Sequence, residues 1–160
     1  ALRVLGAEVE TRNAGGETRR LALDDFYRLP GDTPHLENAL EPGELVTAVR
    51  LPPPTGTEHR YRKVRDRASY AFALVSVGAE VSMDGDAIGE TRIAFGGVAH
   101  KPWRAARAEE VLRGQRPSTE LFAAAADAEL GEARALEGNE FKVPLARRTL
   151  IATLRELSTR

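Results

Sequence analysis

The sequence predicts an α+β fold: a three-stranded antiparallel sheet, then three helices packed on one face of it, with shorter strands preceding the sheet. Two observations support this prediction. Apolar residues alternate with a period of two as far as residue 98, and with a helical period beyond it. The run "PPPTGTEH" separates the first strands from the rest, because consecutive prolines form a stiff connector that cannot join a sheet ladder. We therefore expect segments at 1–52 and 59–160, joined by a proline-rich linker at 53–58.

Short strands account for the first segment. "RVLGAEVET" alternates in the manner of a strand, and "AGGE" follows it as a hairpin turn. "TRRLALDDFYRL" begins extended and leads into one helical turn that Asp24 is placed to cap. "TPHLENALEPGE" has the composition of a loop. "ELVTAVRLP", at 44–52, carries apolar residues on both sides, which predicts a strand covered on both faces.

Three strands and three helices account for the second segment. The strands are expected at 59–67, 71–83 and 88–98, with the Asp-Gly pair of "DGD" turning the chain between the last two. A first helix ends at Gly114, a residue suited to a helix C-terminus. Ser118 is a predicted N-cap for an Ala-rich second helix, and Pro144 lies in the first turn of the third.

Composition excludes several classes of function. The formal charge of −1 provides no general attraction for nucleic acid, and no apolar run is long enough to predict membrane insertion. There is no cysteine, so this chain offers no thiolate nucleophile, cysteine-ligated zinc or iron–sulfur site. The three histidines fall in separate loops, which disfavours a histidine metal site. The opening residues resemble the middle of a strand, and we expect the chain to be part of a longer one.

Two stretches stand out as candidates for chemistry. In the first, Lys63 lies within a strand that also carries four arginines, and adjacent cations at 62 and 63 must point to opposite faces. This strand is interpreted either as a solvated surface or as a ligand site in which the lysine lines the rim of a cleft. In the second, "AFGGVAHKPWRA", the paired glycines form a bulge or allow a close backbone approach. Trp103 in that stretch either packs under the helices or walls a ligand site, and packing is favoured.

The same residues resemble a known family. "ELVTAVRLP", "KVRDRASYAFA" and "FGGVAHKPWRA", with the closing "FKVPLARRTLIATLREL", are similar to the C-terminal portion of the FAD-binding subunit of molybdenum hydroxylases. These include xanthine dehydrogenase, aldehyde oxidoreductase and carbon monoxide dehydrogenase flavoproteins. The resemblance implies that 1–52 ends a second FAD-binding subdomain and that 59–160 is the C-terminal domain. "RDRASYAFALVSV" looks most like the flavin subunits of bacterial aldehyde oxidoreductases.

The resemblance also implies the cofactor-binding residues. Val46 lies in the strand whose backbone meets the cofactor, Lys63 corresponds to a flavin-contacting lysine, and Tyr70 falls in a loop beside the isoalloxazine ring. Other members carry an acidic residue at the position of Tyr70. No residue is expected to be catalytic or to bind metal. The family's glycine-rich phosphate loops are absent from this sequence, so we expect the chain alone to bind FAD weakly or not at all and to be inactive.

The function implied by the resemblance is electron relay. Electrons would pass from molybdopterin in a large partner subunit, through [2Fe–2S] clusters in a small one, to FAD and an external acceptor. The alternative is a docking module that assembles the subunits without a direct role at the flavin. A cytoplasmic location is favoured, with the periplasm open to an exported complex. Substrate, acceptor and oligomeric state are not indicated by these residues.

Overall fold

The computed structural model describes residues 1–54 and 58–158, which divide into two compact units, Leu2–Pro54 and Thr55–Arg160 with Ala1. Each unit has its own antiparallel sheet and its own apolar core. None of the helices in the described ranges has the length and apolar character needed to cross a membrane. The mixed α+β class is confirmed.

The Leu2–Pro54 unit is a three-stranded antiparallel sheet with strand order β2-β1-β3 and one turn of helix. Its small core consists of Ala7, Val9 and Leu23, with Phe26 and Tyr27 packed against them. The hairpin predicted at "AGGE" is present, with Gly16 at φ 87°. The elements are β1 (Glu8–Arg12), β2 (Thr18–Ala22), α1 (Leu23–Phe26) and β3 (Leu45–Arg50).

Three predictions for this unit need correction. The first strand begins only at Glu8, because the residues before it form a turn. The predicted cap Asp24 lies inside the first turn of α1, whose N-cap is Ala22. The strand expected to be covered on both faces, β3, is an edge strand with exposed apolar side chains, since no layer of its own unit packs over it. The exposed apolar residues of this strand and its end are Leu45, Val46, Val49 and Leu51.

A buried carboxylate joins three segments of this unit. Glu44 is 3% exposed in its side chain and accepts hydrogen bonds from Arg19 Nε (2.6 Å) and Arg19 Nη2 (2.6 Å). The Thr11 hydroxyl and the Glu41 backbone N–H also donate to it. The guanidinium, followed by the hydroxyl and the backbone donor, lowers the pKa of Glu44 from its ordinary 4.5 to about 2. The charged form is therefore favoured in the folded unit.

This network predicts acid sensitivity of the Leu2–Pro54 unit. Because the folded-state pKa of Glu44 is lower than its unfolded value, its contribution is complete above about pH 4.5 and is lost as the pH falls toward 2. We expect amide NMR signals of β1 and β2 to show unfolding in that window, with Glu44→Gln less stable at pH 7 and less pH-dependent below 4.5. Glu37→Gln, at an exposed position, is the control. An unchanged acid response in Glu44→Gln would refute this role.

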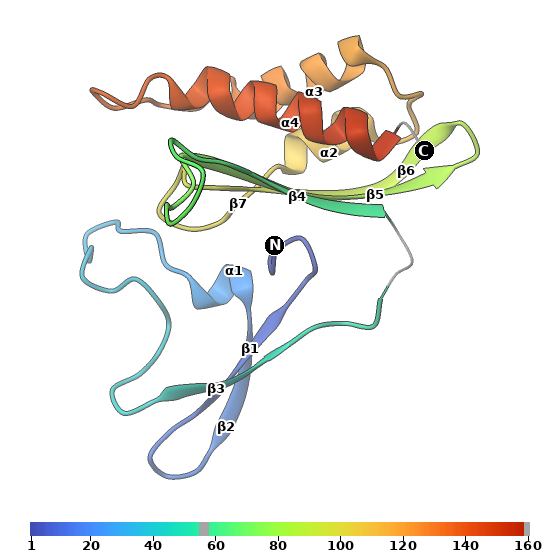
Figure 1. Cartoon of the computed structure of the whole chain (residues 1–160). Helices are drawn as coiled ribbons and strands as arrows, with labels where there is room; N and C mark the ends of the chain where they lie inside the picture. Colours follow the sequence, from blue (N-terminus) through green and yellow to red (C-terminus); the bar gives the residue numbers. More distant parts are fainter. Residues whose placement is uncertain (55–57, 159–160) are drawn as a thin grey trace. The chain divides into compact units, whose positions relative to one another are not determined.

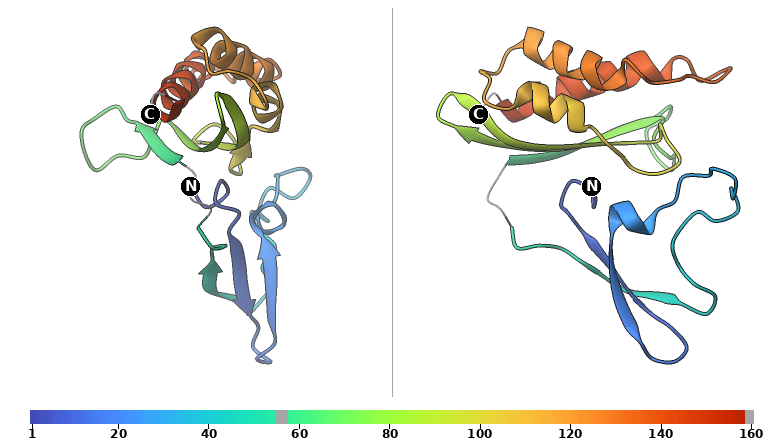
Figure 2. Two further views of the ribbon diagram at one scale, coloured as in Figure 1. Left: turned by 90° about the vertical axis from the view of Figure 1, so that its right-hand side faces the viewer. Right: turned by 180° about the vertical axis from the view of Figure 1, so that it is seen from behind.

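The second unit is a four-stranded antiparallel sheet, order β4-β5-β6-β7, with all three of its helices on one face (Figure 1). The predicted helix layer is confirmed, and Figure 2 shows it from two further directions. The sheet has one strand more than predicted: two residues after the Gly-Gly stretch pair with the end of β6. The elements are β4 (Glu58–Val64), β5 (Val75–Asp84), β6 (Ala87–Gly96), β7 (Trp103–Arg104), α2 (Ala106–Leu112), α3 (Thr119–Leu130) and α4 (Lys142–Ser158).

Local signals in the sequence set most ends of these elements. Gly85 turns the β5–β6 hairpin at φ 58°, and Gly114 follows α2 at φ 72°. The Ser118 hydroxyl accepts a hydrogen bond from the Leu121 backbone N–H (3.0 Å) and caps α3. The core between sheet and helices is mostly apolar, and the buried Thr149 and Thr153 hydroxyls of α4 donate to carbonyls of their own helix. Its largest completely buried side chains are Phe95, Ile88, Ile93, Leu112, Leu150 and Leu154.

Two buried glutamates connect the helices to the sheet. Glu109 of α2 accepts hydrogen bonds from the Ile93 backbone N–H (2.7 Å) and from the Arg104 guanidinium (2.5 and 2.9 Å). Glu129 of α3 accepts from the Trp103 indole N–H (2.7 Å) and from two backbone N–H groups in the first turn of α2. Because α2 has no side-chain cap of its own, Glu129 supplies one from another helix. These contacts fix β7 and α2 against α3.

Candidate functional site

The cationic strand β4 divides its charges between two faces. Arg60 and Arg62 point to the helix side, where both form ion pairs with Glu156 of α4. A shallow hollow on that side is lined by Arg62, Ala152, Arg155 and Glu156. The two arginines therefore fasten an edge strand to the helix layer. This explains how adjacent cations at 62 and 63 are accommodated, because strand alternation turns Lys63 to the opposite face.

Lys63 is the exposed cation of that opposite face. It pairs in register with Ser76 of β5, so its backbone is held by the sheet. Its ammonium makes no hydrogen bond or ion pair with any residue in 1–54 or 58–158, and its side chain is exposed. A lysine on a rigid strand with unused donors is suited to an anionic or electron-rich ligand. That Lys63 lines a cleft stays a prediction.

The loop 65–73 after β4 exposes two aromatic side chains. Tyr70 and Phe72 are each 95% exposed. Tyr70 is also the one residue other than glycine with positive φ in the described part of the chain, at 54°. The Arg67 guanidinium donates to the Tyr70 carbonyl and holds this bend. Two exposed aromatic side chains, one of them on a strained backbone, are typical of contact loops rather than of packing.

The paired glycines form the base of this loop. Gly97 has φ 78°, and a Cβ there would lie 2.9 Å from the Leu74 carbonyl oxygen and 3.1 Å from that of Ala73. At Gly96 a Cβ would lie 2.6 Å from the Ser76 hydroxyl. The end of β6 thus approaches the segment that closes the loop and continues into β5. Of the two interpretations of the glycine pair, close approach is the one seen: Gly97 approaches backbone carbonyls and Gly96 approaches the Ser76 side chain.

Trp103 packs under the helices, the role that sequence analysis favoured. Its ring lies edge-on to Phe95, with centroids 6.1 Å apart, and its indole N–H is bound by Glu129. The ring also borders a small cavity described below. Among the described residues, no three or more His, Asp or Glu side chains are arranged to hold a metal ion.

The structure places the predicted cofactor residues on both units. Val46 lies on β3 of the Leu2–Pro54 unit and is 45% exposed, while Lys63 and Tyr70 belong to the other unit. Each of the three side chains is exposed on the surface of its own unit. A site that brings them together stays a prediction. The motifs did not single out Phe72, which is as exposed as Tyr70 two positions earlier.

Comparison with known proteins decides the family. The family described as CO dehydrogenase flavoprotein C-terminal domain matches residues 59–157, and the FAD binding domain in molybdopterin dehydrogenase matches residues 1–54. The chain belongs to the FAD-binding subunit family of molybdenum hydroxylases. The family inferred from the sequence motifs is confirmed.

Individual relatives agree with this assignment. The chain is 51% identical over 98% of its length to the aldehyde oxidoreductase FAD-binding subunit PaoB of Escherichia coli (strain K12), covering 46% of that protein. It is 35% identical over 79% of its length to the carbon monoxide dehydrogenase medium chain of Afipia carboxidovorans, covering 43% of it. The structure of reconstituted CO dehydrogenase from Oligotropha carboxidovorans matches with a TM-score of 0.85 at 27% identity, over 99% of this chain and 55% of that one. The chain thus spans about half the length of these flavin-subunit relatives, which are oxidoreductase subunits.

The described residues fit contact with a flavin ring, since an unpaired ammonium and an exposed aromatic loop occur together on one unit. Lys63 would lie beside the ring and Tyr70 would cover it. When bound, a flavin supplies electron transfer that no amino-acid side chain of this chain supplies.

Proposed function

We propose that the chain works within a longer flavin subunit of a molybdenum hydroxylase, where it helps relay electrons through FAD to an external acceptor. Residues 1–52 would end the second FAD-binding subdomain and 59–160 would form the C-terminal domain. The observation that carries this proposal is the similarity of both units, in order, to families named for FAD binding or for a flavoprotein. Molybdopterin and [2Fe–2S] clusters would be held by large and small partner subunits.

Lys63 has a specific electrostatic role in this proposal. A cation beside a flavin ring stabilises the negative charge of its reduced state, and so raises its reduction potential. The two arginines of the same strand pair with Glu156 on the other face, and Lys63 is directed away from α4. Tyr70, in a loop held by Arg67, would limit access of water and of acceptors to the ring.

The test is Lys63→Ala in the complete subunit assembled with its partners. We expect the flavin reduction potential to fall by on the order of tens of millivolts, or FAD to be lost, because a nearby positive charge is removed. Arg60→Ala removes the same charge from the opposite face of β4 and is the matched control, with an expected potential close to that of the parent. Spectroelectrochemical titration of the flavin measures both.

A docking module is the second candidate, in which the cationic edge strand β4 with its exposed Lys63 is a subunit interface. It predicts a different result for Lys63→Ala: loosened subunits, visible by size-exclusion chromatography, with normal FAD content and potential. That combination would refute the electron-relay role of Lys63.

A further inference from the structure

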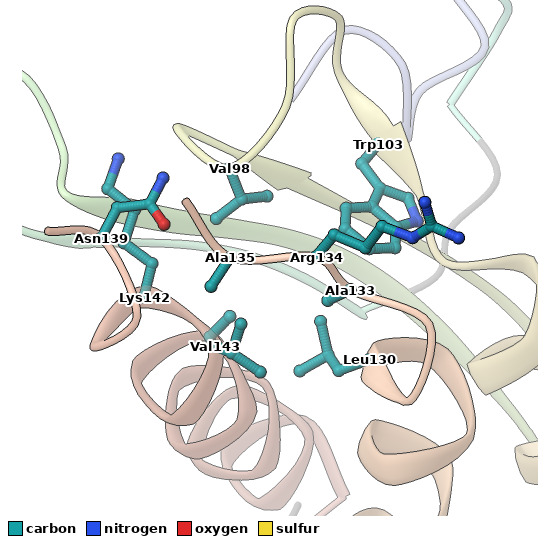
Figure 3. A pocket seen from close by; sticks show the side chains of 10 residues that line it. Val98, Trp103, Leu130, Ala133, Arg134, Ala135, Asn139, Lys142 and Val143 are labelled. Carbon is teal, nitrogen blue, oxygen red and sulfur yellow. The ribbon is translucent and has the colours of Figure 1, made fainter. Parts of the chain in front are cut away.

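A small cavity lies where the α3–α4 connection meets the start of α4 and the loop after β6 (Figure 3). Its volume is about 60 Å³. The floor is apolar and comes from four separate segments, with Val98, Trp103, Leu130 and Val143 directed toward the space. None of the residues proposed for flavin contact lines it. This cavity is therefore a feature separate from the candidate flavin site.

The polar side chains at its margin offer donors. Lys142 Nζ donates one hydrogen bond to the Gly97 carbonyl (2.7 Å), and an ammonium has two further N–H groups. The Asn139 side-chain oxygen accepts from the Leu136 backbone N–H (2.8 Å), which identifies the remaining side-chain group as the NH₂ donor. Figure 3 shows these two groups on the same side of the cavity, with Arg134 at the other side. Within the described residues, the Asn139 NH₂ has no hydrogen-bond acceptor.

We propose that this cavity binds a small monocarboxylate with a compact, branched apolar tail, of the size of isobutyrate. The N–H donors at the margin that have no acceptor in the protein favour an anion as the ligand. The charge of Lys142 favours a carboxylate over a neutral amide. The floor of Val, Leu and Trp side chains excludes a fully hydrated anion such as sulfate, whose lost hydration it cannot replace. The volume limits the tail to a few carbon atoms, well below the size of an aromatic ligand.

The orientation follows from the positions of these groups. The carboxylate would take the N–H donors of Lys142 and Asn139, and the tail would lie against Val98 and Val143. Such a ligand has few atoms to bind with, so a dissociation constant of about 1–10 mM is expected. The site would make the Thr55–Arg160 unit responsive to short carboxylates independently of the flavin.

Amide NMR of the chain, titrated with sodium isobutyrate and separately with isobutyramide, tests the proposal. We expect saturable shifts of the Trp103 indole and Asn139 side-chain signals with isobutyrate, and at least about tenfold weaker binding of the neutral isostere. Lys142→Met keeps the aliphatic stem and should weaken isobutyrate binding about tenfold. Arg148→Met, an exposed position on the same helix, should leave it unchanged.

A second variant distinguishes loss of binding from loss of folding. Ala135→Leu fills the cavity from the exposed connection between the helices and should abolish the saturable shifts while the spectrum stays dispersed. Equal binding of isobutyrate and isobutyramide would overturn the proposal, as would isobutyrate binding that survives either Lys142→Met or Ala135→Leu. The absence of saturable shifts at isobutyrate concentrations up to 100-fold the expected dissociation constant would overturn it as well.

Discussion

Replacing Glu129 with alanine is expected to lower the free energy of unfolding of the Thr55–Arg160 unit by about 3 kcal/mol. Glu129 is 6% exposed, and its carboxylate accepts from the Trp103 indole and from the Arg107 and Ala108 backbone N–H groups. Truncation leaves these donors without their acceptor, and α2 loses the cap that α3 supplies. Hydrogen bonds to a charged group are worth more than neutral ones, which makes this loss large for one residue.

Glu132→Ala is the matched control for this prediction. Glu132 lies just after the same helix and pairs with Arg107, but both of these side chains are more than half exposed. A surface pair of this kind contributes at most about 1 kcal/mol. Denaturant unfolding followed by Trp103 fluorescence compares the two variants. If Glu129→Ala were no less stable than Glu132→Ala, the role of Glu129 as a shared buried cap would be wrong.

Replacing Gly97 with alanine is the second large expected effect. The backbone is in the left-handed region at φ 78°, and the added Cβ would lie 2.9 Å from the Leu74 carbonyl oxygen, a backbone atom that cannot move away cheaply. We expect a loss of about 2–4 kcal/mol in the free energy of unfolding, because strain and steric overlap add. The loop 65–73 should also shift, since Leu74 closes it through a hydrogen bond to Val64.

Gly138→Ala separates the two causes. Gly138 has φ 82°, and a Cβ there would meet nothing within 4 Å, so its expected cost is the conformational strain alone, about 1 kcal/mol. Urea unfolding gives the difference between the variants, and amide shifts of residues 65–73 report on the loop. Equal destabilisation of the two variants, with unchanged loop signals, would show that Gly97 does not support the loop by close packing.

Much of the fold could be predicted because its signals are local. The Asp-Gly turn at Gly85, the cap at Ser118 and the stop at Gly114 depend on backbone preferences of single residues, and all three are present. The change of apolar period placed three helices after the strands, as observed. The family, too, was recognisable, because the motifs around Lys63 and Gly97 are short and contiguous.

The candidate site could be predicted less completely. Sequence alternation required Arg62 and Lys63 to face opposite ways, but it did not show which of them would be paired. The partner is Glu156, 94 residues away along the chain. Whether Val46 joins Lys63 and Tyr70 at one ligand depends on how two units meet, which no local pattern encodes.

The sequence by itself determined the order of the elements, their turns and caps, and the family to which the chain belongs. Tertiary structure alone decided that Glu109 and Glu129 are buried hydrogen-bond acceptors and not solvent-facing helix charges. It also decided that Trp103 begins a fourth strand and that β3 leaves its apolar side chains exposed. The physical reason is the distance along the chain over which each kind of interaction acts. Backbone propensities act over a few residues, whereas burial and ion pairing depend on groups that only folding brings within hydrogen-bond distance.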